Sequence, residues 1–248
     1  NGYYGTAYAI YSMILMIATY SIPTAVSKII SGKLALGEYR NARRVFKCAF
    51  IYVVSVGLVA AVLTFAFAPA LVKEQPNAIL SLQILAPTIF LSGFLAIYRG
   101  YLQAYKTMIP TSISQIIEQI ANAVVSVLAA YLMSRPFAPG TSEHAKYGAA
   151  GSAMGTGAGV LCGIIYILIA YAGRRKEIME TVESDVSSNI ESYGKLFRQI
   201  VMIVTPIIIA AFVYNITTTV DMKIFYNALN STNVDRVYCA NYYDTISC

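Results

Sequence analysis

The chain has 248 residues, of which 57% are hydrophobic and 12% are charged, and its mean hydropathy is +0.60. Soluble globular domains carry about 25% charged residues, so this composition excludes an ordinary water-soluble domain. The net charge of +6 does not indicate a nucleic-acid partner, because the basic residues are grouped between long apolar segments, as in membrane proteins.

Six long segments contain no charged residue or only one, namely residues 1–27, 48–72, 75–98, 107–134, 147–173 and 199–220. A helix needs about 20 apolar residues to cross a ~30 Å hydrocarbon core. A helix at the surface of a soluble protein would instead show charged residues every turn or two. The sequence therefore predicts an all-α, polytopic membrane helix bundle with about six transmembrane helices.

The first expected span, residues 7–28, contains Pro23, which would interrupt the helical hydrogen bonds locally. In the charged connection that follows, residues 34–47, apolar positions recur at helical spacing. This spacing predicts a short surface helix that leads directly into the second span, residues 48–72. The third span, residues 78–102, contains Pro87, and the fourth begins at Pro110, a favourable residue for a first helical turn, and ends near residue 133.

The fifth span, residues 148–171, has a glycine at every fourth position: Gly151, Gly155, Gly159 and Gly163. Small residues at this spacing allow two helix backbones to approach closely, so we expect intimate contact with another helix. Residues 173–195 form the longest polar stretch and the best domain boundary. Apolar residues at every fourth position favour a helix along the membrane surface there, and a solvated linker is the alternative. The sixth span covers residues 196–226.

The basic residues fix the orientation of these spans. Thirteen lie in one alternating set of connections and four in the other, with Lys223 left out because it lies inside a span. Connections facing the cytoplasm are enriched in Lys and Arg. We therefore expect Asn1 outside, and residues 31–47, 99–109 and 174–198 on the cytoplasmic side of a bacterial cytoplasmic membrane.

No group of residues indicates catalysis. The single histidine, His144, lies in a loop, and the chain has neither a phosphate-binding Gly-x-x-x-x-Gly-Lys sequence nor a nucleophile elbow. We expect the chain not to be an enzyme and to hold no metal or cofactor.

Polar residues inside the spans are the candidate functional residues. The fourth span carries six of them on about a third of its circumference: Ser112, Gln115, Glu118, Gln119, Asn122 and Ser126. A carboxylate facing lipid is costly, so this stripe must face protein or water. A hydrated cavity is one interpretation, and a hydrogen-bonded seam between helices is the other.

Further candidates lie in the sixth span and at span ends. Asn215, Asp221 and Lys223 occupy the polar second half of the sixth span, whereas Lys28 and Arg99 lie at cytoplasmic span ends. The two basic residues at span ends could reach lipid phosphates, or attract a phosphate-bearing substrate. We predict that Arg99, Glu118, Asp221 and Lys223 line one hydrated cavity, because intramembrane charges need a partner, water or a substrate.

Three stretches resemble one family. The sequences SIPTAVSK (residues 21–28) and KLALGEYRNAR (33–43), YRGYLQAY (98–105), and IPTSISQIIEQ (109–119) are similar to those of the stage V sporulation protein B group. That group resembles lipid II flippases and polysaccharide exporters, in a superfamily that also contains multidrug extruders. The chain would correspond to helices two to seven of a longer protein.

The resemblance implies a fold of two helical lobes around a central cavity. Residues 1–173 would supply five helices of the first lobe, residues 174–195 the inter-lobe linker, and residues 196–248 the first helix of the second lobe and an outer loop. The implied substrate is a saccharide linked to undecaprenyl pyrophosphate, with membrane lipids and a coupling ion as further partners. Two alternatives stay open: a cation-coupled multidrug extruder of the same superfamily, and a membrane scaffold without transport.

Overall fold

In the computed structural model, residues 2–16, 22–73, 76–183, 185 and 190–230 are described. For residues 2, 3, 6, 211, 212, 215, 216 and 218–230 the description covers the backbone alone. The chain divides into two compact units, Asn1–Pro206 and Ile207–Cys248.

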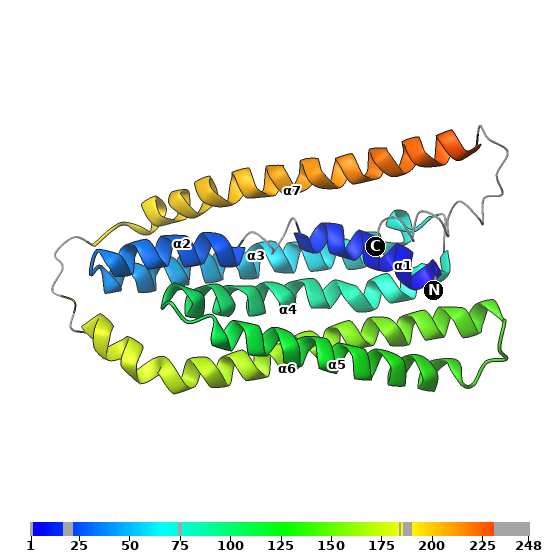
Figure 1. The fold of residues 1–248 in the computed structure, drawn as a ribbon, viewed down its shortest axis with the longest axis horizontal. Coiled ribbons are helices and arrows are strands. Elements are labelled where there is room, and N and C mark those ends of the chain that lie inside the picture. Colours follow the sequence, from blue (N-terminus) through cyan, green and yellow to red (C-terminus); the bar gives the residue numbers. More distant parts are fainter. Residues whose placement is uncertain (1, 17–21, 74–75, 184, 186–189, 231–248) are drawn as a thin grey trace. The chain divides into compact units, whose positions relative to one another are not determined.

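The described residues form helices and no strand, as predicted (Figure 1). The helices are α1 (Gly2–Leu15), α2 (Ile22–Ala35), α3 (Tyr39–Leu71), α4 (Ile79–Ala104), α5 (Ile109–Ser134), α6 (Ser142–Glu183) and α7 (Tyr193–Asn230), with a 3-10 turn at Pro76–Ala78. Among the described residues, five segments are long and apolar enough to cross a membrane: Tyr39–Leu71, Pro76–Ala104, Ile109–Ser134, Ser142–Glu183 and Tyr193–Ala210. They confirm the second to sixth predicted spans, and the chain is a multi-pass membrane protein.

The first expected span corresponds to α1 and α2, which have 14 residues each. Residues 17–21, between them, lie outside the described part. Pro23 is therefore placed in the first turn of α2, where its missing N–H would have no partner within the helix. Gly100 of α4 allows α2 to approach there, because a Cβ atom at Gly100 would lie 2.8 Å from the Cα of Pro23.

Two connections predicted to be helical extend neighbouring spans. The basic stretch before the second span is the beginning of α3, which runs without interruption to Leu71, as predicted. Beyond the fifth span, α6 continues to Glu183 and buries Ile178 and Val182. The apolar stripe of this region thus packs partly against protein, at the end of the bundle predicted to face the cytoplasm.

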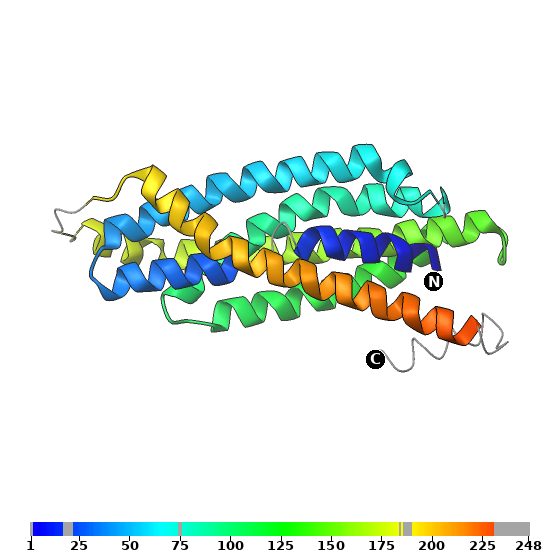
Figure 2. The ribbon, with the colours of Figure 1, turned by 90° about the horizontal axis from the view of Figure 1, so that it is seen from above.

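The core of the first unit lies around α4. This helix contacts α1, α2, α3 and α6, and it buries large side chains along its whole length: Leu82, Leu85, Ile89, Leu95, Ile97, Tyr101 and Leu102. In contrast, α5 packs chiefly against α6 and buries only three described residues, Thr111, Ser114 and Ser134. Figures 1 and 2 show α2 to α6 running side by side in this unit. One broad face of α5 is consequently exposed.

Candidate functional site

Arg99 and Glu118 form an ion pair between α4 and α5. Arg99 Nη2 donates to Glu118 Oε2 at 2.7 Å, and Arg99 Nε donates to Ser114 Oγ at 2.8 Å. Only 13% of the Arg99 side chain and 22% of the Glu118 side chain are exposed. The structure thus brings together two of the four charged residues predicted to share one site, and it places them in direct contact.

The pair lies inside the predicted membrane-spanning region, toward the cytoplasmic end. Glu118 follows the first residue of α5 by nine positions, which is about 13 Å at 1.5 Å per residue. Arg99 precedes the end of α4 by five positions. A single charge at such a depth costs a few kcal/mol or more. Each residue therefore stabilises the other, and removing one leaves an uncompensated buried charge.

The turn after α4 makes this pairing possible. Residues 105–108 join the two helices tightly, with Lys106 at a φ of 61°, so the chain reverses direction within four residues. Beyond the turn, α5 leaves α4 and packs along α6. The long side chain of Arg99 spans the resulting separation between α4 and α5. This reach, together with the several donors of the guanidinium, explains why arginine suits the position.

The glycine face of α6 determines how closely α5 approaches. A Cβ atom at Gly151 would lie 2.5 Å from the carbonyl carbon of Ala129, and one at Gly159 would lie 2.6 Å from the backbone oxygen of Glu118. The predicted close contact of Gly155 and Gly159 with a neighbouring helix is confirmed. Gly163 lies next to the ion pair, where a Cβ atom would meet Leu95 Cδ2 at 3.1 Å and Arg99 Nη2 at an ordinary contact distance of 3.6 Å.

The polar stripe of α5 divides between two environments. Ser126 Oγ lies 2.9 Å from Asn122 Oδ1 and 3.0 Å from the backbone oxygen of Ser152 in α6. These two residues form part of a seam between helices. Ser112, Gln115 and Gln119 are exposed on the face of α5 that no described residue covers. The seam interpretation therefore applies to Asn122 and Ser126, whereas a hydrated cavity along the exposed members stays a prediction.

The other predicted site residues lie elsewhere. Lys28 is exposed on α2 and does not belong to the contacts around Arg99. Asn215, Asp221 and Lys223 fall within the helical range of α7, but their side chains lie outside the described residues. Their place in a common cavity with Arg99 and Glu118 stays a prediction.

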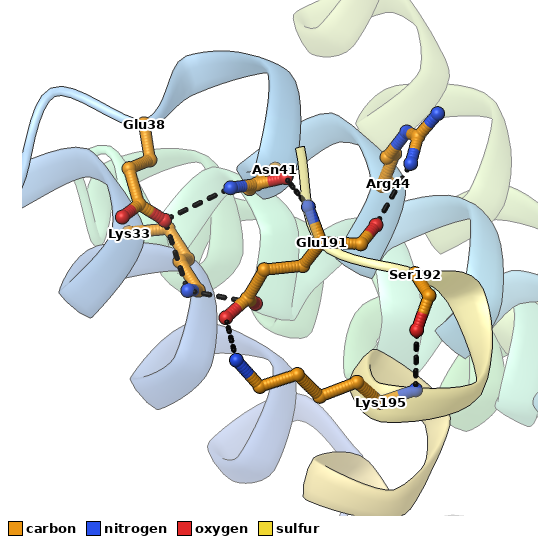
Figure 3. Close-up of polar contacts among 7 residues, drawn as sticks. All are labelled: Lys33, Glu38, Asn41, Arg44, Glu191, Ser192 and Lys195. Carbon is orange, nitrogen blue, oxygen red and sulfur yellow. Dashed lines mark hydrogen bonds and ion pairs between the residues drawn. The ribbon is translucent and has the colours of Figure 1, made fainter. Parts of the chain in front are cut away.

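Sequence reasoning missed a second polar group, which lies at the end of the bundle predicted to face the cytoplasm. It is called here the linker cluster and consists of Lys33, Glu38, Asn41, Arg44, Glu191 and Lys195 (Figure 3). Glu191 Oε2 lies 2.8 Å from Lys33 Nζ, and Glu191 Oε1 lies 2.8 Å from Lys195 Nζ. Its backbone N–H donates to Asn41 Oδ1 at 3.0 Å, and its carbonyl accepts from Arg44 Nη1 at 2.7 Å. The linker before α7 is thereby fastened to α2 and α3.

The charges of the linker cluster stabilise one another. Hydrogen bonds from Lys195 and Lys33 hold the pKa of Glu191 below its usual value, and those from Lys33 and Asn41 lower the pKa of Glu38. Burial by itself would lower the pKa of Lys33, but its contacts with Glu191 and Glu38 raise it. In the sequence these residues resemble ordinary solvated loop charges, and contacts about 150 positions apart leave no periodic signal that could have revealed them.

Comparisons with known proteins agree on the type of protein. A family model described as "Polysaccharide biosynthesis protein" matches residues 1–244. The chain is 22% identical over 230 residues to lipid II flippase MurJ of Bacillus subtilis (strain 168), covering 88% of this chain and 42% of that protein. It is 21% identical over 219 residues to stage V sporulation protein B of the same organism, covering 87% and 40%. The chain thus spans about two fifths of each relative, and no solved structure matches it significantly.

Proposed function

The chain belongs to the polysaccharide biosynthesis protein family, and from this premise we propose that it is part of a flippase of the bacterial cytoplasmic membrane. The cargo is an undecaprenyl-linked sugar, a precursor of the cell wall or of a polysaccharide, and it crosses by alternating access. The name of one relative, a lipid II flippase, supports this proposal. The chain would act as a transporter and not as a catalyst.

The observation that carries the proposal is the Arg99–Glu118 pair beside the exposed amides of α5. A pyrophosphate group needs a cation in a partly dehydrated place, and the guanidinium of Arg99 matches phosphate geometry. Gln115 and Gln119, four residues apart on the same exposed face, offer hydrogen bonds to sugar hydroxyls. The arrangement thus combines one cation with neutral polar groups, which suits a head group of phosphate and sugar.

The pair also suggests how binding couples to movement. When a substrate phosphate accepts hydrogen bonds from Arg99, Glu118 loses its partner. Burying its carboxylate without a partner then costs free energy. Movement that brings Glu118 to water or to another cation would relieve that cost. After release of the phosphate, Arg99 and Glu118 pair again and the cycle is reset.

The multidrug alternative receives less support from the same residues. An extruder of cationic drugs needs an acidic residue available to the drug. Among the described residues of the five membrane-spanning segments, the acidic side chain at intramembrane depth is Glu118, and Arg99 already neutralises it. An anionic substrate gains the guanidinium, whereas a cationic one must compete with it.

Transport by the full-length protein tests this proposal. The double variant Arg99→Gln/Glu118→Gln removes both charges, leaves hydrogen-bonding groups of similar size, and should reach the membrane at a normal level. We expect its rate of flipping a fluorescent undecaprenyl-pyrophosphate saccharide in proteoliposomes to fall at least about tenfold, the loss of one charge-assisted contact of roughly 1.5 kcal/mol. It should also fail to complement a flippase-depleted strain.

The control variant is Arg175→Gln, which removes one positive charge at the exposed cytoplasmic end of α6. It should transport normally. Normal transport by the double variant would instead show that the pair only holds α4 and α5 together, as a scaffold requires. Arg99→Lys adds a further check. Lysine keeps the positive charge that folding requires, but it lacks the two-donor geometry of the guanidinium.

A further inference from the structure

Four basic side chains line a groove at the beginning of α3. Arg40, Arg43, Arg44 and Lys47 recur at intervals of three and four residues, so they share one face of the helix. The opposite wall comes from the end of α6 and the start of α7, including Glu183 and Tyr193. This basic groove encloses about 410 Å³, which is enough for a lipid head group.

The charges in this groove are poorly balanced by the protein. The first turn of α3 contains no acidic residue, although the N-terminal end of a helix already carries partial positive charge. Asp185 Oδ2 accepts the backbone N–H of Arg40 at 2.8 Å, and Glu183 is the acidic residue in the wall. Four cations against Glu183 and Asp185 leave an excess of positive charge among the described residues of the groove, and this excess favours an anionic ligand.

One of the four cations is held in a fixed orientation. The guanidinium of Arg44 donates to the carbonyl of Glu191 at 2.7 Å and lies 4.8 Å from the centre of the Tyr193 ring. Cations that only follow the positive-inside rule extend freely into water. Arg44 is instead anchored at the mouth of a concave site, so the groove is a preorganised feature of the fold.

The position along α3 places the groove among the lipid head groups. Lys47 directly precedes the apolar segment 48–72, and Arg40 lies seven residues earlier, about 10 Å along the helix axis. Clusters of Lys and Arg immediately cytoplasmic of a membrane span attract anionic lipids. The phosphate layer of the inner leaflet lies at this level, within reach of the cations of the groove.

We propose that the basic groove binds the phosphate of an anionic phospholipid head group from the cytoplasmic leaflet. The phosphate accepts hydrogen bonds from the arginines, and the apolar parts of the wall contact the glycerol backbone. Because the groove is bounded by α3 on one side and by the linker on the other, the bound lipid joins the two and stabilises the docked linker. This inference holds whichever substrate the protein moves.

Two matched double variants of the full-length protein test the site. Arg40→Gln/Lys47→Gln removes two exposed cations from the groove, whereas Arg175→Gln/Lys176→Gln removes two exposed cations from the same side of the membrane outside it. Each cation near an anionic surface contributes roughly fivefold in affinity. In thermal-shift titrations with phosphatidylglycerol, we expect the groove variant to bind at least about tenfold more weakly than the control variant.

The lipid phosphatidylcholine and soluble inorganic pyrophosphate serve as the comparison ligands. Stabilisation by phosphatidylglycerol that depends on the groove and exceeds that of both comparison ligands supports the proposal. Equal loss of affinity in the two double variants would overturn it, since only total charge would then matter. Saturation of the groove by pyrophosphate alone would overturn the phospholipid as the ligand and assign the site to a soluble phosphate compound.

Chemical labelling provides a measurement on the unaltered protein. Lys47 and Lys176 are both exposed, and only Lys47 lines the groove. In nanodiscs containing phosphatidylglycerol, acylation of Lys47 by a water-soluble reagent should slow several-fold relative to phosphatidylcholine nanodiscs, while acylation of Lys176 changes less. Equal slowing of both lysines would contradict a defined site.

Discussion

The Arg99–Glu118 pair and the linker cluster use the same chemistry in different surroundings. Both place cations within 2.7 to 2.9 Å of carboxylate oxygens. The Arg99–Glu118 pair (the inner pair) has one acid and one base within predicted membrane spans, and 13% of the Arg99 side chain and 22% of the Glu118 side chain are exposed. In the linker cluster Glu191 is shared between two lysines; the side chain of Lys195 is 60% exposed, whereas those of Lys33 and Glu191 are 13% and 8% exposed. The comparison teaches that each charge of the inner pair has one charged partner, whereas Glu191 has two, of which Lys195 can exchange its contact with water.

The largest expected effect on folding comes from a change in the seam between α5 and α6, which positions the inner pair. Gly159→Leu would drive a side chain into the backbone of Glu118, which cannot yield without separating α5 from α6. We expect loss of most folded protein, measured by size-exclusion chromatography of a fluorescent fusion. Gly173→Leu is the matched control, because its Cβ atom meets no neighbour within 4 Å. A normal yield for Gly159→Leu would show that α5 and α6 separate without cost.

Removing one residue of the inner pair should lower the stability of the folded protein less than the glycine change does. It should lower that stability more than any change in the linker cluster. Arg99→Gln leaves Glu118 as an unpaired carboxylate, which costs about 3–5 kcal/mol in buried pairs. Thermal unfolding in detergent should therefore show a lower midpoint for Arg99→Gln than for the double variant Arg99→Gln/Glu118→Gln. The opposite order would mean that Glu118 is already neutral or solvated.

Removing the charge of Glu191 tests the linker cluster. Glu191→Gln keeps the backbone bonds to Asn41 and Arg44 but weakens the contacts with Lys33 and Lys195. Hydrogen bonds to charged groups contribute about 1.5 kcal/mol or more, so amide hydrogen exchange of residues 190–195 should accelerate roughly tenfold. Glu177→Gln, at an exposed site on α6, should leave this exchange unchanged. Unchanged exchange in both variants would show that the backbone bonds alone hold the linker.

The smallest effect is the response of the linker cluster to pH and salt. The lowered pKa values of Glu191 and Glu38 stabilise the docked linker above their ordinary value of 4.5, and this contribution is lost as the pH falls through the lowered values. The raised pKa of Lys33 contributes below 10.5 and is lost as the pH rises through the raised value. The distribution of distances between spin labels at Leu36 and Gly194 should thus stay narrow near neutral pH and become broader below pH 4.5.

Salt should slightly broaden the same distribution of spin-label distances, because exposed ion pairs are screened at high ionic strength. The inner pair should not respond to salt, since it lies within predicted membrane spans. A response of the Arg99–Glu118 region as strong as that of the linker would remove the contrast between the two.

Much of the fold could be predicted because the membrane imposes simple rules. Apolar segments of sufficient length predicted the five spans from α3 to α7, and the glycines of α6 predicted its close contact with another helix. The structure of residues 1–28 as a whole could not be predicted, because an apolar segment with a proline is compatible with one helix or two. The polar stripe of α5 indicated unusual residues but not their separate environments, since helical periodicity fixes a face and not its neighbour.

The sequence by itself determined that this chain lies in a membrane and where five of its spans lie, and it predicted how the spans alternate. These properties follow from local composition, because hydrocarbon excludes charge wherever the chain places it. Only the tertiary structure decided that Arg99 meets Glu118, that Gly159 brings α6 against the backbone of Glu118, and that Glu191 fastens the linker to α2 and α3. Those contacts join residues on different helices, and packing alone selects which helices lie side by side.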